Sequence, residues 1–173
     1  MGHAAWDALA EQLGAVEDTA HGRTEHGSDG LARVAIEKIL GEDEFRAAVD
    51  HYVAGRRGSE LARSVLRLLR PGSAMQRCRE ISTQSTDPDG RRAAVELLRV
   101  VADRRALPWV SDYLDDSDEV VQQWGIRIVD QLLFSDLIEP EDAEPLLRRA
   151  EDHPNAEVRA QAQEIRAFLK SRA

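Results

Sequence analysis

The sequence has only one cysteine, no long hydrophobic run and no amino-terminal stretch of the kind that directs secretion. The lone Cys78 excludes an internal disulfide framework and a zinc site built on paired cysteines. No apolar run approaches the roughly 18 residues needed to cross a bilayer. Residues 1–20 carry four acidic side chains instead of the positive start and apolar centre of a signal peptide. We therefore expect a cytoplasmic protein that does not associate with membranes.

Motifs for catalysis and for cofactor binding are also missing. The sequence has no Gly-x-Ser-x-Gly turn and no glycine-rich phosphate loop. Among the histidines, only His21 and His26 are close along the chain, and no second pair of metal ligands accompanies them. Cys78 lies at helical spacing from Met75 and Ile81, which predicts a small core residue rather than a nucleophile. We expect no catalytic residue, no metal and no cofactor.

Aromatic residues make up only 5% of the chain, and the apolar set is mostly Leu, Val, Ile and Ala. This mixture favours helix over strand. No run alternates apolar and polar residues as a half-buried strand would. The composition therefore predicts an all-α fold, within the length of one domain.

Apolar residues recur at helical spacing in five similar stretches, and this repeat is the main organising feature of the chain. Two of the stretches begin with the same triplet, at Leu31–Arg33 and at Leu61–Arg63. The last three stretches share a small residue at one position, Ala94, Gly125 and Ala162, which would let a neighbouring helix come close. The five stretches span residues 32–39, 62–69, 90–101, 121–132 and 158–169.

A shorter helical stripe precedes each of these stretches, so ten helices in about five antiparallel pairs are expected. Ser, Asp, Asn and Pro residues stand where the second helix of each pair would begin, as capping requires. The prediction is one α-solenoid domain over residues 1–173. Within it we expect an N-terminal capping helix over 1–20 and a loop over 21–30, and the clearest repeats lie in 87–170.

The stretch Asn155–Ala162 resembles the second-helix signature of HEAT repeats, with weaker copies at Asp118–Val121 and Asp87–Arg91. The chain is most similar to short bacterial HEAT-like repeats, including those of phycobilisome-lyase-type proteins. It departs from the pattern at Arg91, where Val is usual, and at Trp124, where a small residue is usual. The resemblance implies a superhelix whose second helices line a concave face, and a binding role more than a catalytic one.

Arginine is abundant on the polar side of the expected second helices. The chain has 21 arginines and only two lysines. A column of arginines on the concave face would suit a carboxylate-rich or phosphate-bearing ligand, because guanidinium binds such groups bidentately. Alternatively, the column pairs with Glu96, Asp103, Asp130 and Glu164. The candidate binding residues are Arg63, Arg67, Arg92, Arg99, Arg127 and Arg166.

Charge is banded along the chain: residues 56–105 carry a net charge of +6, and residues 110–157 carry −11. The acidic band could neutralise a basic toxin or nuclease, as an immunity-type protein does, or the bands could pair with each other. Trp109 and Tyr113, four residues apart, could form an exposed aromatic patch. The acidic candidates are Asp112, Asp115 and Asp116, followed in sequence by Asp118 and Glu119.

These patterns favour a non-enzymatic scaffold that binds another protein through its concave face or its acidic band. Two other classes stay open. A tetrapyrrole-handling lyase or chaperone follows only from the phycobilisome-type resemblance. Nucleic-acid binding is disfavoured, because the net charge is −9 and only one band is basic. The identity of the partner and the oligomeric state are not encoded in any recognisable motif.

Overall fold

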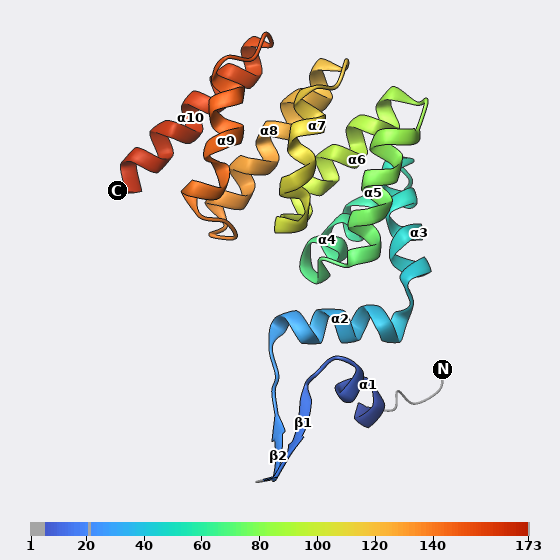
Figure 1. The fold of residues 1–173 in the computed structure, drawn as a ribbon. Coiled ribbons are helices and arrows are strands. Elements are labelled where there is room, and N and C mark those ends of the chain that lie inside the picture. The colour runs from blue at the N-terminus through green and yellow to red at the C-terminus, as the bar shows by residue number, and fades with distance from the viewer. Residues whose placement is uncertain (1–5, 21, 173) are drawn as a thin grey trace.

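The computed structural model describes residues 6–20 and 22–172, and this part of the chain forms ten α-helices, one 3-10 helix and one β-hairpin. The prediction of an all-α solenoid is therefore confirmed for most of the chain (Figure 1). The helices are α1 (Trp6–Gln12), α2 (Asp29–Leu40), α3 (Glu42–Val53), α4 (Ser59–Leu69), α5 (Gly72–Gln84), α6 (Pro88–Val101), η1 (Arg104–Trp109), α7 (Val110–Leu114), α8 (Glu119–Phe134), α9 (Pro140–Glu151) and α10 (Ala156–Arg172).

Four helix pairs stack side by side and make the body of the molecule. The pairs are α3 with α4, α5 with α6, α7 with α8, and α9 with α10. The second helices also pack on one another in order, α4 on α6, α6 on α8, and α8 on α10, as Figure 1 shows. This row of second helices is the surface on which the sequence predicts binding.

The second helices begin where the sequence predicts. The Asp87 carboxylate accepts hydrogen bonds from the backbone N–H groups of Asp89 and Gly90 at the start of α6. Asp118 does the same for Val120 and Val121 at the start of α8. These carboxylates accept hydrogen bonds from N–H groups that have no partner within the helix. Their negative charge also interacts favourably with the positive end of the helix dipole.

The apolar positions of the last three repeats form the core, and the small residues allow close packing between helices. Ala94, Gly125 and Ala162 occupy the predicted column, and both alanines are fully buried. A Cβ atom built on Gly125 would lie 2.7 Å from the Cβ of Tyr113 on α7. The absence of a side chain at Gly125 therefore sets the distance between α7 and α8.

The N-terminal segment differs from the prediction. Helix α1 ends at Gln12, and strands β1 (Val16–Thr19) and β2 (Gly22–Glu25) pair antiparallel where a helix followed by a loop is expected. Residues 1–5 of the expected capping helix, and His21, lie outside the described residues. The prediction of no strand is wrong here because each strand has four residues and the hairpin is almost wholly exposed, so no apolar alternation marks it.

Helix α2 does not continue the stack as an ordinary second helix. It lies across the end of the stack in Figure 1, and only Ala35 of its residues is buried, whereas Ile39 of the predicted apolar stripe is 45% exposed. Its anchor is Glu37, whose carboxylate accepts from the backbone N–H groups of Gly72 and Ser73 at 2.8 and 2.7 Å. An acidic side chain thus caps α5 from another helix, a contact that no local pattern encodes.

We predict that replacing Gly125 with Ala destabilises the protein by about 1–3 kcal/mol. The added methyl group meets the Cβ of Tyr113. The position of a Cβ atom is fixed by the backbone, so no change of rotamer can move it away. Urea unfolding followed by circular dichroism measures the change in the free energy of unfolding. The matched control is Gly30→Ala on exposed α2, where the nearest atom is 3.7 Å away and alanine improves helix propensity. Equal effects at the two sites would contradict the packing argument.

We also predict that Glu37→Gln loosens the docking of α2, at a cost of about 1–3 kcal/mol at neutral pH. Burial raises the pKa of Glu37, but hydrogen bonds from Ser73 and Gly72 and the charge of Arg105 outweigh it, so the pKa lies below its ordinary value of 4.5. A depressed pKa gives stability that is full above that ordinary value and is lost as the pH falls through the folded-state pKa.

Hydrogen exchange of the α2 amides, measured between pH 3 and 7, checks this prediction. The difference between wild type and Glu37→Gln should be largest at neutral pH and should shrink below about pH 4.5. Glu17→Gln in the exposed β1 strand is the control and should leave α2 protection unchanged. A difference that grows on acidification would contradict the assigned role of the carboxylate.

Candidate binding surface on the second helices

A pocket opens on the row of second helices where α4, α6 and α8 meet. Its volume is about 340 Å³, and its lining is mostly polar. The lining residues are Arg63, Ser64, Arg67, Arg99, Val100 and Gln131. The structure therefore brings three of the predicted arginines together, from two neighbouring helices.

Arg63 is only partly neutralised. Its guanidinium lies 3.1 Å from the exposed Glu60 and 3.5 Å from Glu96, while its Nε is buried and has no hydrogen-bond acceptor. Glu96 is also shared, because it lies 3.5 Å from Arg99 and accepts a hydrogen bond from the Tyr52 hydroxyl. One carboxylate thus serves two guanidinium groups and a phenol.

Arg99 and Arg127 both lie over the ring of Trp124, at 5.2 and 5.1 Å from its centroid. These cation–π contacts hold the two guanidinium planes in place. The Nε of Arg99 is buried without an acceptor, whereas that of Arg127 donates to Gln161 at 3.2 Å. Burial and the charge of Glu164 raise the pKa of nearby Asp130, although Arg99 and Arg127 lower it in part.

Arg67 has no hydrogen bond or ion pair with any residue in 6–20 or 22–172, and its side chain is exposed at the pocket. Together with the free Nε groups of Arg63 and Arg99, it gives the pocket an excess of N–H donors over acceptors. An arrangement of this kind can bind a carboxylate or phosphate group, because guanidinium donates two parallel hydrogen bonds to such anions.

Two of the predicted arginines are instead occupied by structural ion pairs. Arg92 contacts Asp118 at 2.8 Å and Asp89 at 3.0 Å. Arg166 contacts Glu144 at 2.5 Å and Glu151 at 2.7 Å. Hydrogen bonds from Arg166 and from Arg148 lower the pKa of Glu144 to about 2. Arg92 thereby joins α6 to the start of α8, and Arg166 joins α10 to α9, which leaves both guanidinium groups with less capacity for a ligand.

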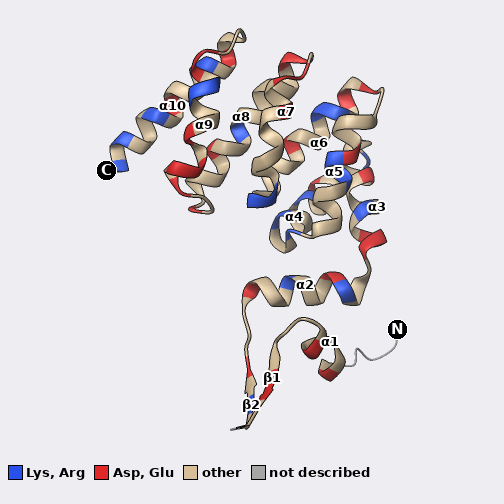
Figure 2. Ribbon diagram, viewed as in Figure 1, with Lys and Arg blue, Asp and Glu red and all other residues tan. Residues whose placement is uncertain are grey.

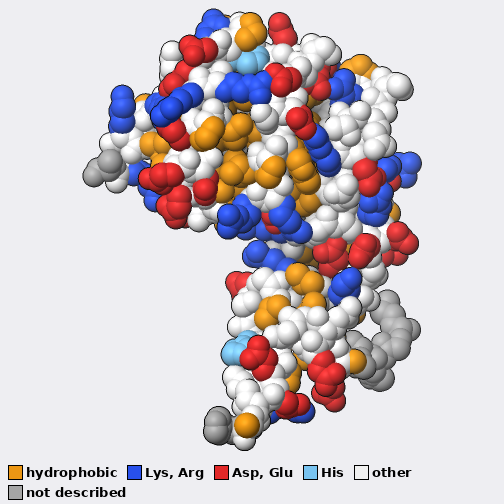
Figure 3. All heavy atoms as spheres, viewed as in Figure 1, with side chains coloured by type: hydrophobic (Ala, Val, Ile, Leu, Met, Phe, Trp, Pro, Cys, Tyr) orange, Lys and Arg blue, Asp and Glu red, His pale blue; other side chains and the backbone are white. Residues whose placement is uncertain are grey.

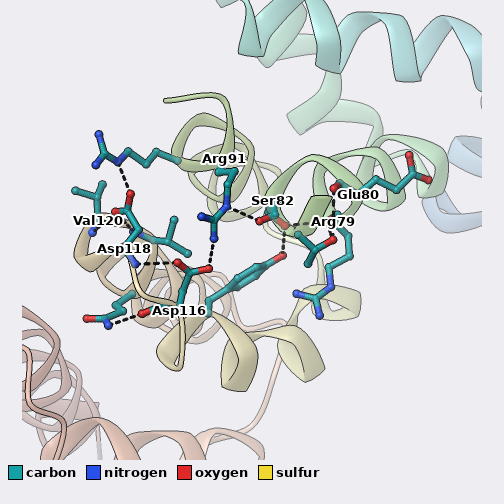
Figure 4. A network of polar contacts seen from close by, with 12 residues as sticks. Arg79, Glu80, Ser82, Arg91, Asp116, Asp118 and Val120 are labelled. Atoms are coloured by element: carbon teal, nitrogen blue, oxygen red, sulfur yellow. Dashed lines mark hydrogen bonds and ion pairs between the residues drawn. The ribbon is translucent and has the colours of Figure 1, made fainter. Parts of the chain in front are cut away.

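The acidic candidates also pair with arginines of neighbouring helices. The pairs are Asp112 with Arg79, Asp115 with Arg149, and Asp116 with Arg91. Figure 4 shows Asp116 between Arg91 and the backbone N–H of Asp118, in the loop that begins α8. Figure 2 shows acidic segments along this loop and along the start of α9. These three carboxylates of the acidic band therefore take part in contacts between repeats.

The prediction of an exposed aromatic patch is wrong for Tyr113, which is only 2% exposed. Its hydroxyl lies 3.1 Å from the hydroxyl of Ser82, and the Arg79 guanidinium lies over both the Tyr113 and Trp109 rings. Trp109 is half-buried. Helical spacing places the two rings together correctly, but it does not distinguish an outward face from one that the next helix covers.

Cys78 is buried in the core as predicted, and burial raises the pKa of its thiol. A protonated, enclosed thiol is a poor nucleophile. No three His, Cys, Asp or Glu side chains gather as a metal site in residues 6–20 and 22–172. None of the helices in this part of the chain is both long and apolar enough for a transmembrane span.

Gln131 and Ser64 line the pocket but are absent from the predicted set. Gln131 lies one helical turn after Arg127, so the spacing that singles out Arg127 also marks Gln131. Gln131 carries no charge, so a pattern of charged residues does not include it. Ser64 follows Arg63 directly and lines the pocket only because α4 presents both side chains toward the same opening.

A comparison with protein families supports the repeat pattern. The family model described as HEAT repeats matches residues 76–166, which is just over half of the chain and includes Arg99 and Gln131. No curated protein and no solved structure matches the chain.

We predict that Glu96→Gln destabilises the protein by about 2–3 kcal/mol, because it removes the one carboxylate that Arg63 and Arg99 share. The positive charges of the two partly buried guanidinium groups would then be offset by one carboxylate fewer. Chemical unfolding at low salt measures the loss. Glu11→Gln on α1, an exposed position, serves as control and should change stability by less than about 0.5 kcal/mol. If Glu96→Gln leaves the free energy of unfolding unchanged, repulsion between Arg63 and Arg99 does not limit the stability of the protein.

Proposed function

This chain belongs to the HEAT-repeat family, and on that premise we propose that it binds an acidic segment of a partner protein through the pocket on α4, α6 and α8. HEAT-like repeats stack into extended surfaces that generally serve as protein-interaction scaffolds. The proposed activity is binding alone, with no bond made or broken. The chain acts as a preformed surface that requires little rearrangement of its helices.

The observation that carries the proposal is the excess of donors in the pocket. The Nε groups of Arg63 and Arg99 are buried without acceptors, and Arg67 has no partner among the described residues. A buried donor without an acceptor costs about 1–3 kcal/mol. A carboxylate from a ligand would pair with the exposed Arg67 and with the accessible parts of the Arg63 and Arg99 guanidinium groups, and it would offset the positive charge of the cluster.

An extended segment fits the site better than a small isolated anion. The pocket lies on a continuous row of second helices, where Arg127 and Trp124 follow directly beyond Arg99. The two arginines are already held against the indole, so little side-chain entropy is lost when they bind. Successive acidic side chains of a partner could meet Arg67, then Arg99, then Arg127 along this row.

The acidic-band alternative has less support. The carboxylates of Asp112, Asp115 and Asp116 are already paired within the stack. A basic partner would have to displace those arginines before it gained contacts of its own. In the arginine pocket, by contrast, Arg67 forms no ion pair among the described residues, so a ligand can pair with it without displacing a carboxylate.

The test uses the full chain and a fluorescein-labelled peptide of six glutamates at low salt, followed by fluorescence anisotropy. We expect the double variant Arg67→Gln, Arg99→Gln to weaken binding at least tenfold, because it removes two charge-assisted contacts. The matched control is Arg56→Gln, Arg57→Gln, which makes the same charge change on exposed residues that do not line the pocket.

A six-glutamine peptide and a salt titration complete the test. Binding should require the charged peptide and should weaken as salt rises. Equal loss in both double variants would show general electrostatic attraction and would overturn the proposed site. Absence of binding at low salt would overturn the proposal as well.

A further inference from the structure

A second basic pocket lies between α2 and the end of the repeat stack. Its volume is about 270 Å³, and four arginines line it: Arg33 on α2, Arg70 at the end of α4, and Arg104 and Arg105 at the start of η1. Figure 3 shows basic side chains gathered where the N-terminal part meets the stack. The pocket shares no lining residue with the pocket on α4, α6 and α8.

The two carboxylates at this pocket already have partners. Asp103 accepts hydrogen bonds from the side chain of Arg105 at 2.7 and 2.9 Å and from its backbone N–H at 2.9 Å. Glu37 accepts from Gly72 and Ser73 at the start of α5. Only Arg105, of the four arginines, is thereby neutralised.

The other three arginines form no ion pair within the described part of the chain. The side chains of Arg33 and Arg104 make no hydrogen bond or ion pair within the described part of the chain. The Nε of Arg70 is buried and has no acceptor. Burial, followed by the charges of Arg33 and Arg67, lowers the pKa of Arg70, although Asp103 opposes this effect. Four arginines and two carboxylates, Glu37 and Asp103, line the pocket, so the pocket carries a net positive charge.

The backbone fixes this arrangement. Arg70 ends α4 in the left-handed conformation, with φ of 48°, and its carbonyl oxygen accepts from the Arg105 guanidinium at 2.7 Å. Arg105 in turn lies close to Gly72, where a Cβ atom would stand 2.8 Å from its Nη1. Arg70 and Arg105 are therefore positioned by helix ends, and Arg33 is positioned by helix α2.

We propose that this pocket binds a phosphate dianion, held by Arg33, Arg70 and Arg104. A dianion offsets more of the three positive charges than one carboxylate does, and its oxygens accept from several guanidinium groups at once. The volume of the pocket admits a phosphoryl group with a small substituent. Since Arg33 belongs to α2 and the other two belong to the stack, the bound anion also fastens α2 in place.

Isothermal titration of the full chain with inorganic phosphate at low salt and pH 7.5 tests the proposal. Arg33→Gln and Arg104→Gln should each weaken binding roughly tenfold, the effect of losing one charge-assisted hydrogen bond. Arg57→Gln, an exposed position outside both pockets, is the matched control and should bind phosphate as the wild type does.

Two further measurements separate the possible sources and the structural consequence. A short phosphoserine peptide that binds more tightly than inorganic phosphate identifies a phosphorylated segment as the ligand, and the reverse order identifies a free phosphate compound. Phosphate should also slow hydrogen exchange in α2 at residues 29–40. The proposal is overturned if neither ligand binds, or if Arg33→Gln and Arg104→Gln behave as Arg57→Gln does.

Discussion

The close contact between successive helix pairs is the constraint on which the rest of the structure depends. No pair can bury its apolar face alone, so each pair must pack on the next through small residues such as Ala94, Gly125 and Ala162. This contact brings the helix ends of adjacent repeats within reach of each other. Ion pairs such as Arg91 with Asp116 then form between repeats because the core has already fixed the distance.

The charge that is left over by these pairs defines the binding surfaces. Asp112, Asp115 and Asp116, around α7 and the start of α8, pair with arginines of α5, α6 and α9. The basic band has more arginines than acidic neighbours. Its excess collects at α4, α6 and η1, in the two pockets that contain Arg63 and Arg70. Regular packing therefore leaves an irregular distribution of unpaired cations.

Helix periodicity and capping residues predict the four stacked pairs well, because both are local properties of the sequence. The positions of Asp87 and Asp118 at helix starts and the small column at Gly125 need no tertiary information. The docking of α2 through Glu37 could not be foreseen, since it depends on a helix start 35 residues away. The pairing of the arginines also depends on distant residues. Arg67 and Arg166 have similar local patterns, but only Arg166 contacts carboxylates in the fold. The arginines of the repeated triplets, Arg33 and Arg63, line one pocket each.

We infer that arginines with an N–H donor left without an acceptor bind ligands, whereas arginines that carboxylates hold on two sides, such as Arg166, maintain the fold. Nitrogen-15 NMR of the arginine Nε–H groups, recorded while an acidic peptide is added, tests this distinction at each residue. We expect changes in chemical shift and slowed proton exchange at Arg63, Arg67 and Arg99, and no change at Arg92 and Arg166. Equal changes in chemical shift in these two groups of arginines would contradict the distinction.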